Sequence, residues 1–130
     1  ALALNSQKAD VVFQIAGNTG SGVFQAAQEN GFYAIGVDMD QKITAKSFDD
    51  VIICSMIKKV GASIYDVIKG YVENGELASG TWVADMSNGY LGLVYGDETS
   101  TQQISDELKA EIEDCQAKIL AGEITVDTTR

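Results

Sequence analysis

A chain of 130 residues is long enough to bury the core of one ordinary domain, and its formal net charge of −10 would repel a nucleic-acid backbone. We therefore expect a single domain and no nucleic-acid partner. The chain contains no histidine, so it lacks the usual general base and the commonest metal ligand. This excludes Ser-His and Cys-His nucleophile pairs, and with them most hydrolase mechanisms. We predict no metal site and no cofactor.

The first predicted element is the end of a helix. Leu2 and Leu4 fit the last turn of an amphipathic helix that ends near Asn5 and Ser6. Since a domain seldom begins in the last turn of a helix, we expect the chain to be a fragment, with signal or lipid-attachment sequences upstream of Ala1.

A strand and a helix follow, joined by a glycine-rich loop at residues 17–22. Residues 11–16 form a short, nearly continuous apolar run, which is typical of a strand buried on both faces of a parallel sheet. The helix ends at Gly31, because glycine readily adopts the left-handed conformation that ends helices. A second strand at 32–37 completes a right-handed βαβ unit, and Asp38 lies just past its carboxyl end.

The alternation of strands and helices continues through the middle of the chain. After a polar loop at 39–46, residues 51–56 make a third buried strand, and a helix with apolar residues at helical spacing runs up to Gly75. Two short strands, 81–84 and 90–95, are predicted on either side of an Asn-Gly turn.

A final helix is predicted over about residues 105–121. Ser105 caps its start and Gly122 closes it. Cys115 lies on its apolar face, and Cys54 lies in the third strand. Because the two cysteines are far apart in the sequence and each sits in an apolar pattern, we expect buried free thiols rather than a disulfide.

The glycine-rich loop at 17–22 is compatible with several functions. A phosphate-binding P-loop needs a lysine after its last glycine, where this chain has Val23, and a dinucleotide-binding loop needs G-x-G-x-x-G, whereas this loop reads G-x-x-G-x-G. Asp38 could accept hydrogen bonds from ribose hydroxyls without any phosphate, and N–H groups at the helix start could hold a hydroxyl or carboxylate oxygen. The remaining alternative is a tight turn that binds nothing.

Three segments of the chain follow a longer signature. Residues 9–41, ADVVFQIAGNTGSGVFQAAQENGFYAIGVDMDQ, follow a pattern near A-D-V-[IV]-F-x-x-A-G-G-T-G-x-G…A-I-G-V-D-x-D-Q. Residues 54–70, CSMIKKVGASIYDVIKG, follow T-S-M-x-K-x-V…A-V-Y-D, and residues 105–126 are similar to the helix and tail that close the same signature. By these segments the chain resembles the basic membrane protein family, the PnrA-like nucleoside-binding lipoproteins of bacterial ABC importers.

The resemblance implies a fold. Members have a type I periplasmic-binding-protein fold, in which two α/β lobes enclose the ligand in the cleft between them. Residues 1–130 would then be a single α/β lobe with a three-layer, doubly wound, mostly parallel sheet. This lobe would be mainly the second lobe, in the C-terminal part of a longer protein, and residues 58–80 would cross to the missing N-terminal lobe.

The resemblance also implies a ligand-binding site. Phe13 matches the aromatic residue that stacks on a nucleobase, with core packing as the alternative. Asp38 matches the carboxylate that takes two ribose hydroxyls, with a helix or loop cap as the alternative. Gly17 lets the loop approach the ligand, or merely makes a tight turn. Ser87 stands where the family commonly has a lysine, and its hydroxyl can bond a sugar but carries no charge.

These matches lead to a functional hypothesis and two alternatives. We expect an extracytoplasmic substrate-binding component of an ABC importer, either periplasmic or anchored as a lipoprotein, that binds a purine nucleoside and partners the permease subunits without catalysis. One alternative is a nucleotide-dependent α/β enzyme that uses the loop at 17–22 for phosphate, and the other is a PnrA-like ligand sensor or regulator. With half of the cleft missing, we expect the chain alone to bind ligand weakly or not at all and to self-associate.

Overall fold

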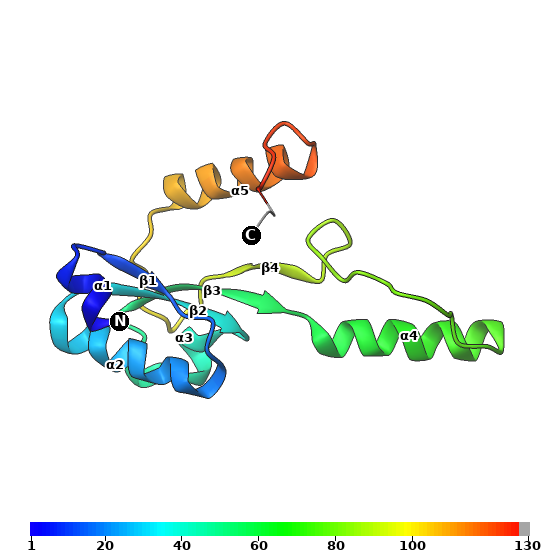
Figure 1. The fold of residues 1–130 in the computed structure, drawn as a ribbon, viewed down its shortest axis with the longest axis horizontal. Coiled ribbons are helices and arrows are strands. Elements are labelled where there is room, and N and C mark those ends of the chain that lie inside the picture. Colours follow the sequence, from blue (N-terminus) through cyan, green and yellow to red (C-terminus); the bar gives the residue numbers. More distant parts are fainter. Residues whose placement is uncertain (128–130) are drawn as a thin grey trace.

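The computed structural model describes residues 1–127 and is built on a four-stranded sheet in the order β1-β2-β3-β4 (Figure 1). The strands are β1 (Val11–Phe13), β2 (Tyr33–Asp38), β3 (Ile52–Lys58) and β4 (Leu91–Val94). The first three pair in parallel and β4 pairs antiparallel to β3. The mostly parallel α/β sheet predicted from the sequence is therefore confirmed.

The hydrophobic core lies between the first three strands and the helix α2 (Ser21–Asn30). Val12, Ala34 and Ile52 occupy neighbouring positions in the sheet and pack against Phe24 and Ala27 of α2. Full burial of each large apolar side chain contributes roughly 1.5–3 kcal/mol, so this cluster supplies much of the driving force for the βαβ unit. As predicted, α2 ends at Gly31, where φ is 71°.

The first strand differs from its prediction. It is three residues long, and its central residue Val12 is buried while Val11 and Phe13 are 38% and 43% exposed. The cause is its position at the edge of the sheet, where α2 covers only one face. Residues 17–20 continue as the 3-10 turn η1 (Gly17–Gly20), which runs directly into α2.

The polar loop predicted at 39–46 is wrong in part, because it holds the short helix α3 (Gln41–Thr44) and the start of η2 (Lys46–Phe48). Asp40 caps α3 by accepting a hydrogen bond from the Lys42 N–H at 3.1 Å. Lys42 itself is fully buried, so a segment that reads as a solvated loop contributes a charge to the interior.

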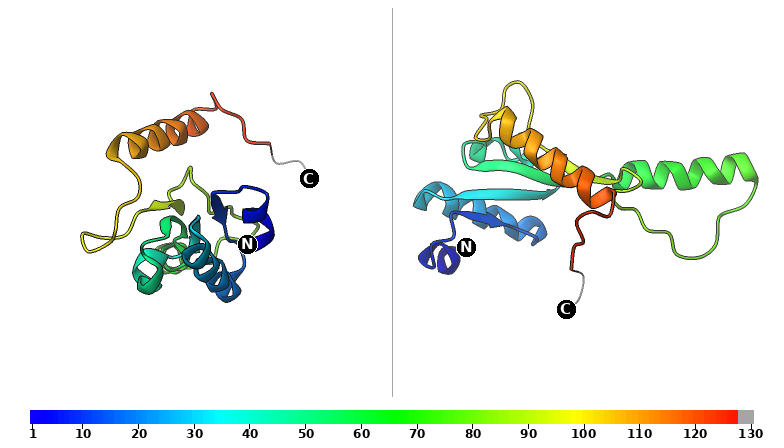
Figure 2. Two further views of the ribbon diagram at one scale, coloured as in Figure 1. Left: turned by 90° about the vertical axis from the view of Figure 1, so that its left-hand side faces the viewer. Right: turned by 90° about the horizontal axis from the view of Figure 1, so that it is seen from above.

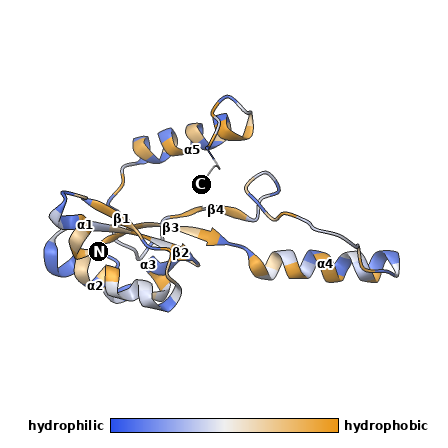
Figure 3. Cartoon of the chain, in the orientation of Figure 1, coloured by the Kyte–Doolittle hydropathy of each residue, from blue (hydrophilic) through white to orange (hydrophobic). Residues whose placement is uncertain are grey.

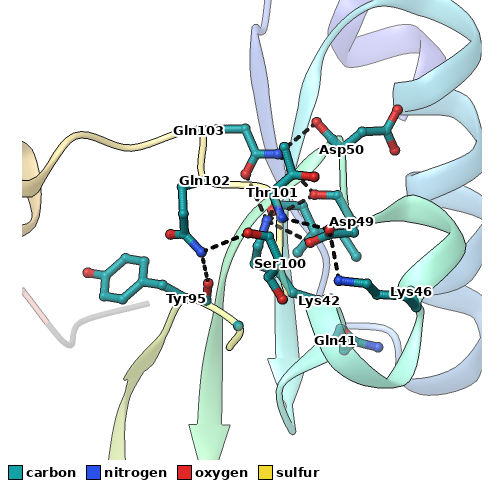
Figure 4. Close-up of polar contacts among 12 residues, drawn as sticks. Gln41, Lys42, Lys46, Asp49, Asp50, Tyr95, Ser100, Thr101, Gln102 and Gln103 are labelled. Carbon is teal, nitrogen blue, oxygen red and sulfur yellow. Dashed lines mark hydrogen bonds and ion pairs between the residues drawn. The ribbon is translucent and has the colours of Figure 1, made fainter. Parts of the chain in front are cut away.

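A buried ion pair fastens the segment after β4 to this region (Figure 4). The Lys42 ammonium lies 3.2 Å from Asp49 Oδ1 and donates to Gln103 Oε1 at 2.7 Å, while the Thr101 N–H donates to Asp49 Oδ2 at 2.7 Å. Burial alone would raise the pKa of Asp49. The hydrogen bonds from the Thr101 N–H, Lys46 and Lys42 outweigh burial and hold that pKa well below its usual range.

A long arm projects from the end of β3. Helix α4 (Val60–Asn74) extends beyond the sheet and ends at Gly75, where φ is 79°, and residues 75–90 return alongside it (Figures 1 and 2). The strand predicted at 81–84 is wrong: this stretch is irregular and does not pair within residues 1–127. Only the second strand of the predicted hairpin forms, and it pairs with β3 as β4.

Helix α5 (Asp106–Leu120) lies on the opposite side of the sheet from α2 and α3 (Figure 2). Ser105 caps it by accepting from the Leu108 N–H at 3.3 Å, as predicted. Every residue of α5 is exposed or half-buried, so the expectation of a buried Cys115 is wrong, whereas Cys54 is buried. Both thiols are free, and burial raises the pKa of Cys54. Within residues 1–127, each helix is too short or too polar to cross a bilayer.

Candidate functional site

The carboxyl ends of three parallel strands lie along one edge of the sheet. Phe13 ends β1, Asp38 ends β2 and Lys58 ends β3, and Gly17 begins the turn that follows β1. Ligands of open α/β sheets bind outside these carboxyl ends. We refer to Phe13, Gly17, Asp38 and Lys58 as the carboxyl-edge site.

Phe13 is an exposed aromatic residue. It is 43% exposed and lies outside the cluster of buried residues that α2 covers. The side chain of its neighbour Val12 takes the core position instead, because successive residues of a strand point to opposite faces. The core-packing alternative for Phe13 is therefore wrong, and its apolar surface is open to a contact.

Gly17 owes its identity to backbone conformation. Its φ is +54°, in the left-handed region that side chains disfavour, and a Cβ built on it would point into open space. The turn itself thus requires glycine, as the tight-turn alternative predicts. The open space beside Gly17 is also the room that a ligand would need to reach the backbone.

Asp38 ends β2 in a strained conformation. Its φ is +72°, and the Met39 N–H donates to the Val37 carbonyl at 2.9 Å, which closes a three-residue γ-turn with Asp38 at its centre. A γ-turn with positive φ is rare and costs about 1–3 kcal/mol. Strain of this kind persists where the surrounding structure holds it, and it clusters at functional sites.

Lys58 is a member of the carboxyl-edge site that sequence analysis missed. Its ammonium lies 2.9 Å from Asp38 Oδ1, and the two side chains are 43% and 49% exposed. An exposed pair contributes only about 0–1 kcal/mol, so a polar ligand could replace it at little cost. The available signal was the position of Lys58 at the end of a buried strand, where it matches the lysine of T-S-M-x-K.

A hollow of about 300 Å³ lies beside Lys58, between the start of α4 and the start of β4. It is lined by Lys58, Lys59, Val60, Ser63, Ala84, Tyr90 and Leu91. The hollow extends the carboxyl-edge site toward the arm, and its lining combines apolar side chains with two consecutive lysines.

Ser87 lies in the turn between the arm and β4. Its hydroxyl donates to Asp85 Oδ1 at 2.6 Å and its N–H donates to the same oxygen at 2.8 Å, and these bonds lower the pKa of Asp85. Among residues 1–127, Ser87 forms no hydrogen bond with the carboxyl-edge site. The structure thus gives Ser87 a role in its own turn, and its hydroxyl oxygen keeps a lone pair that can accept a bond.

The described residues offer no cluster of side chains that could form a metal-binding site. Over residues 1–127, His, Cys, Asp and Glu side chains do not gather in groups of three or more that could hold an ion. In this described part of the chain, the cation that meets Asp38 is the ammonium of Lys58.

Comparison with known protein families identifies relatives of this chain. The family of PnrA-like ABC transporter substrate-binding proteins matches residues 1–130. The chain belongs to this family. Basic membrane protein C of Borreliella burgdorferi strain N40 is 34% identical over 92% of the chain and 33% of that protein. The ABC transporter nucleoside-binding protein BmpA of Lactococcus lactis subsp. cremoris is 31% identical over 90% of the chain and 36% of that protein.

Two crystal structures share the fold of this PnrA-like chain. A transcriptional activator of the comK gene from Bacillus halodurans has a TM-score of 0.76 and 23% identity, over 97% of the chain and 42% of that protein. An ABC transporter solute-binding protein from Aeropyrum pernix K1 has a TM-score of 0.73 and 23% identity, over 98% of the chain and 43% of that protein. At this identity they show the fold alone. The chain spans about a third of the length of the curated relatives described above.

Proposed function

We propose that the chain is the second-lobe part of an ABC importer's substrate-binding component, which holds a purine nucleoside between two lobes and catalyses no reaction. The observation that carries this proposal is the carboxyl-edge site of a PnrA-like chain. There an exposed aromatic residue and an aspartate with a strained backbone lie at the ends of neighbouring strands. The nucleoside-binding name of the Lactococcus relative supports the choice of ligand.

Phe13, Asp38, Gly17 and Ser87 each have a role in this proposal. The ring of Phe13 stacks on the base, because aromatic faces pack well on flat heterocycles. The carboxylate of Asp38 accepts hydrogen bonds from two ribose hydroxyls. These bonds replace its exposed contact with Lys58. The turn at Gly17 admits the ligand close to the backbone, and Ser87 bonds the sugar from the arm.

The arm supports a two-lobe arrangement, with residues 58–80 crossing to a first lobe. Helix α4 projects beyond the sheet and carries hydrophobic residues along its length (Figure 3). These residues are 50–75% exposed, and burial against a first lobe would stabilise the protein by up to about 1.5–3 kcal/mol for each large side chain. They are Val60, Ile64, Tyr65, Val67, Ile68, Tyr71 and Val72.

The proposal also includes partners and a location. The permease subunits are the further partners, and the protein acts outside the cytoplasm, either periplasmic or anchored as a lipoprotein.

Calorimetric titration of the full-length protein with guanosine, adenosine and inosine tests the ligand. We expect saturable binding of at least one of them, and weak or no binding by the 130-residue chain alone. Asp38→Asn is the sharpest variant, since asparagine tolerates positive φ but lacks the charge, and we expect it to weaken binding about tenfold or more. A folded full-length protein that binds none of the three would contradict the nucleoside assignment.

The same titration separates this proposal from a nucleotide-dependent enzyme. Such an enzyme would bind NAD or a nucleoside triphosphate through the loop at 17–22, in the 130-residue chain alone. We expect neither to bind, because Val23 stands where a P-loop has its lysine.

A further inference from the structure

Two glutamine side chains meet beneath the carboxyl-edge site. Gln14 follows β1 and is 3% exposed, and Gln41 is the first residue of α3 and is half-buried. Gln14 Nε2 donates to Gln41 Oε1 at 2.7 Å. The two residues are 27 positions apart in the chain, and each belongs to the connection that follows a strand of the site.

Backbone N–H groups at both ends fix the orientation of the two amides. The Ala16 N–H donates to Gln14 Oε1 at 3.1 Å, and the Val37 N–H donates to Gln41 Oε1 at 2.8 Å. Because only an oxygen can accept these bonds, Gln14 must present its NH₂ group to Gln41. The result is one continuous link from Ala16, next to Gly17, to Val37, next to Asp38.

Two glycines leave the space that this link occupies. A Cβ at Gly20 would lie 2.0 Å from Gln14 Oε1, and a Cβ at Gly36 would lie 2.8 Å from Gln41 Oε1 and 2.5 Å from Ser55 Oγ. Ser55 is fully buried and accepts a hydrogen bond from the Gln41 N–H at 3.0 Å. The link is therefore enclosed by backbone on both sides and tied to β3 as well.

We propose that Gln14 and Gln41 are positioning residues that hold the turn at Gly17 and the γ-turn at Asp38 in one fixed arrangement. This inference rests on the proposed function for its ligand. Its physical basis is that a strained γ-turn needs anchors close to it, and the Val37 N–H is anchored by Gln41 one residue before Asp38. Loss of either amide leaves buried polar groups unpaired and releases both turns together.

Amide hydrogen exchange measured by NMR on the 130-residue chain tests the link without any ligand. We expect Gln41→Leu to speed exchange of the Ala16 amide about fivefold or more, although Gln41 does not touch Ala16. Gln41→Glu keeps both acceptor positions and should leave that rate within about twofold. Gln25→Leu, at an exposed position of α2, is the matched control, and the Ala27 amide in α2 should exchange equally in all variants.

Faster exchange of Val37 alone in Gln41→Leu would overturn the coupling, since each turn would then be held separately. Faster exchange throughout α2 would also overturn it, because the substitution would then act on the whole fold. Exchange of the Ala16 amide as fast in Gln41→Glu as in Gln41→Leu would also contradict the link, because glutamate keeps the acceptor oxygen that the link requires.

Ligand binding by the full-length protein tests the consequence for the site. We expect Gln41→Leu to weaken guanosine binding about tenfold and binding of 2′,3′-dideoxyguanosine by a clearly smaller factor, because the dideoxy ligand lacks the hydroxyls whose hydrogen bonds Asp38 accepts and depends only on the rest of the site. An equal loss of affinity for both ligands would overturn the positioning role and leave the proposed function standing. If the unaltered protein binds neither ligand, the proposed function fails and the positioning role with it, while the exchange measurement still decides whether the two turns are coupled.

Discussion

The region around β1, β2 and β3 buries its apolar side chains, whereas the arm leaves its apolar side chains exposed. Around β1, β2 and β3, apolar side chains pack against α2, and buried polar groups pair with one another, as in the Lys42–Asp49 ion pair. Along α4, by contrast, Ile64 and Tyr71 are 55% and 50% exposed although they follow a regular apolar stripe. An amphipathic helix owes most of its stability to packing. The difference separates a region that is complete within this chain from one that the proposed first lobe would complete.

A core substitution should show the largest effect and sharpen this difference. Phe24 is fully buried, so Phe24→Ala should lower the free energy of unfolding by about 3–5 kcal/mol, whereas Tyr71→Ala in the arm should lower it by less than about 1 kcal/mol. Urea denaturation followed by circular dichroism measures both. Similar losses for the two variants would show that α4 is packed in solution.

The buried ion pair should give the next effect, together with a dependence on pH. Asp49→Asn leaves the buried ammonium of Lys42 without its partner and should destabilise the fold by roughly 3 kcal/mol at neutral pH. Because the folded-state pKa of Asp49 lies below the unfolded value, its stabilisation is complete above about pH 4 and is lost as the pH falls through the folded pKa.

Urea denaturation repeated between about pH 2 and pH 7 therefore separates the two proteins, since their stabilities should converge toward acid pH. A constant difference over the whole range would mean that the charge of Asp49 contributes nothing.

The glycines around the amide link give a smaller and paired prediction. Gly20→Ala places a methyl group against Gln14 and should cost about 1–3 kcal/mol. Gly22→Ala, two residues later, points into open space in α2 and should be neutral or stabilise by up to about 1 kcal/mol. Thermal unfolding measures the melting temperatures of both variants. Equal melting temperatures would contradict the tight packing around the link.

The smallest effect on stability is expected on the arm itself. Val72 is 75% exposed, so Val72→Glu should change the free energy of unfolding by less than about 0.5 kcal/mol. We expect the unaltered chain to self-associate through the apolar residues of α4, and the charge should shift its elution in size-exclusion chromatography toward the monomer. A strict monomer at high concentration before substitution would contradict the exposed stripe as an association surface.

Local signals in the sequence predicted much of this fold. Gly31, Gly75 and Gly122 all have positive φ, and Ser105 caps α5, because these preferences act over a few residues. Helix α3 was missed for the opposite reason. Lys42 is held by Asp49 and by Gln103, which lies 61 positions away, and no pattern within residues 39–46 shows those contacts.

The strand predicted at 81–84 and the burial of Cys115 were wrong because both assumed packing partners from apolar patterning alone. Such patterning indicates that a face is suited to burial, but a partner element must be present to bury it. In the described chain, 81–84 forms no strand pair and α5 is only half-buried at most.

The sequence named Phe13, Gly17 and Asp38 as candidates, but it indicated neither Lys58 nor the geometry of the carboxyl-edge site. Phe13 and Asp38 were found from the signature, yet the exposure of Phe13 follows from the position of β1 at the sheet edge. The pairing of Asp38 with Lys58 depends on the register of β2 and β3, and the link between Gln14 and Gln41 depends on two connections meeting in space. Both are tertiary properties that a single sequence does not display.

The positive φ of Asp38 has a consequence for how this position would change under selection. Glycine there would relieve strain of about 1 kcal/mol or more, and the added freedom of the unfolded chain would offset a similar amount. Asp38→Gly should therefore fold about as well as the unaltered protein while losing the carboxylate. Selection for folding alone would therefore allow glycine to replace aspartate at this position. Retention of aspartate in related proteins would then indicate ligand binding rather than a requirement of the fold.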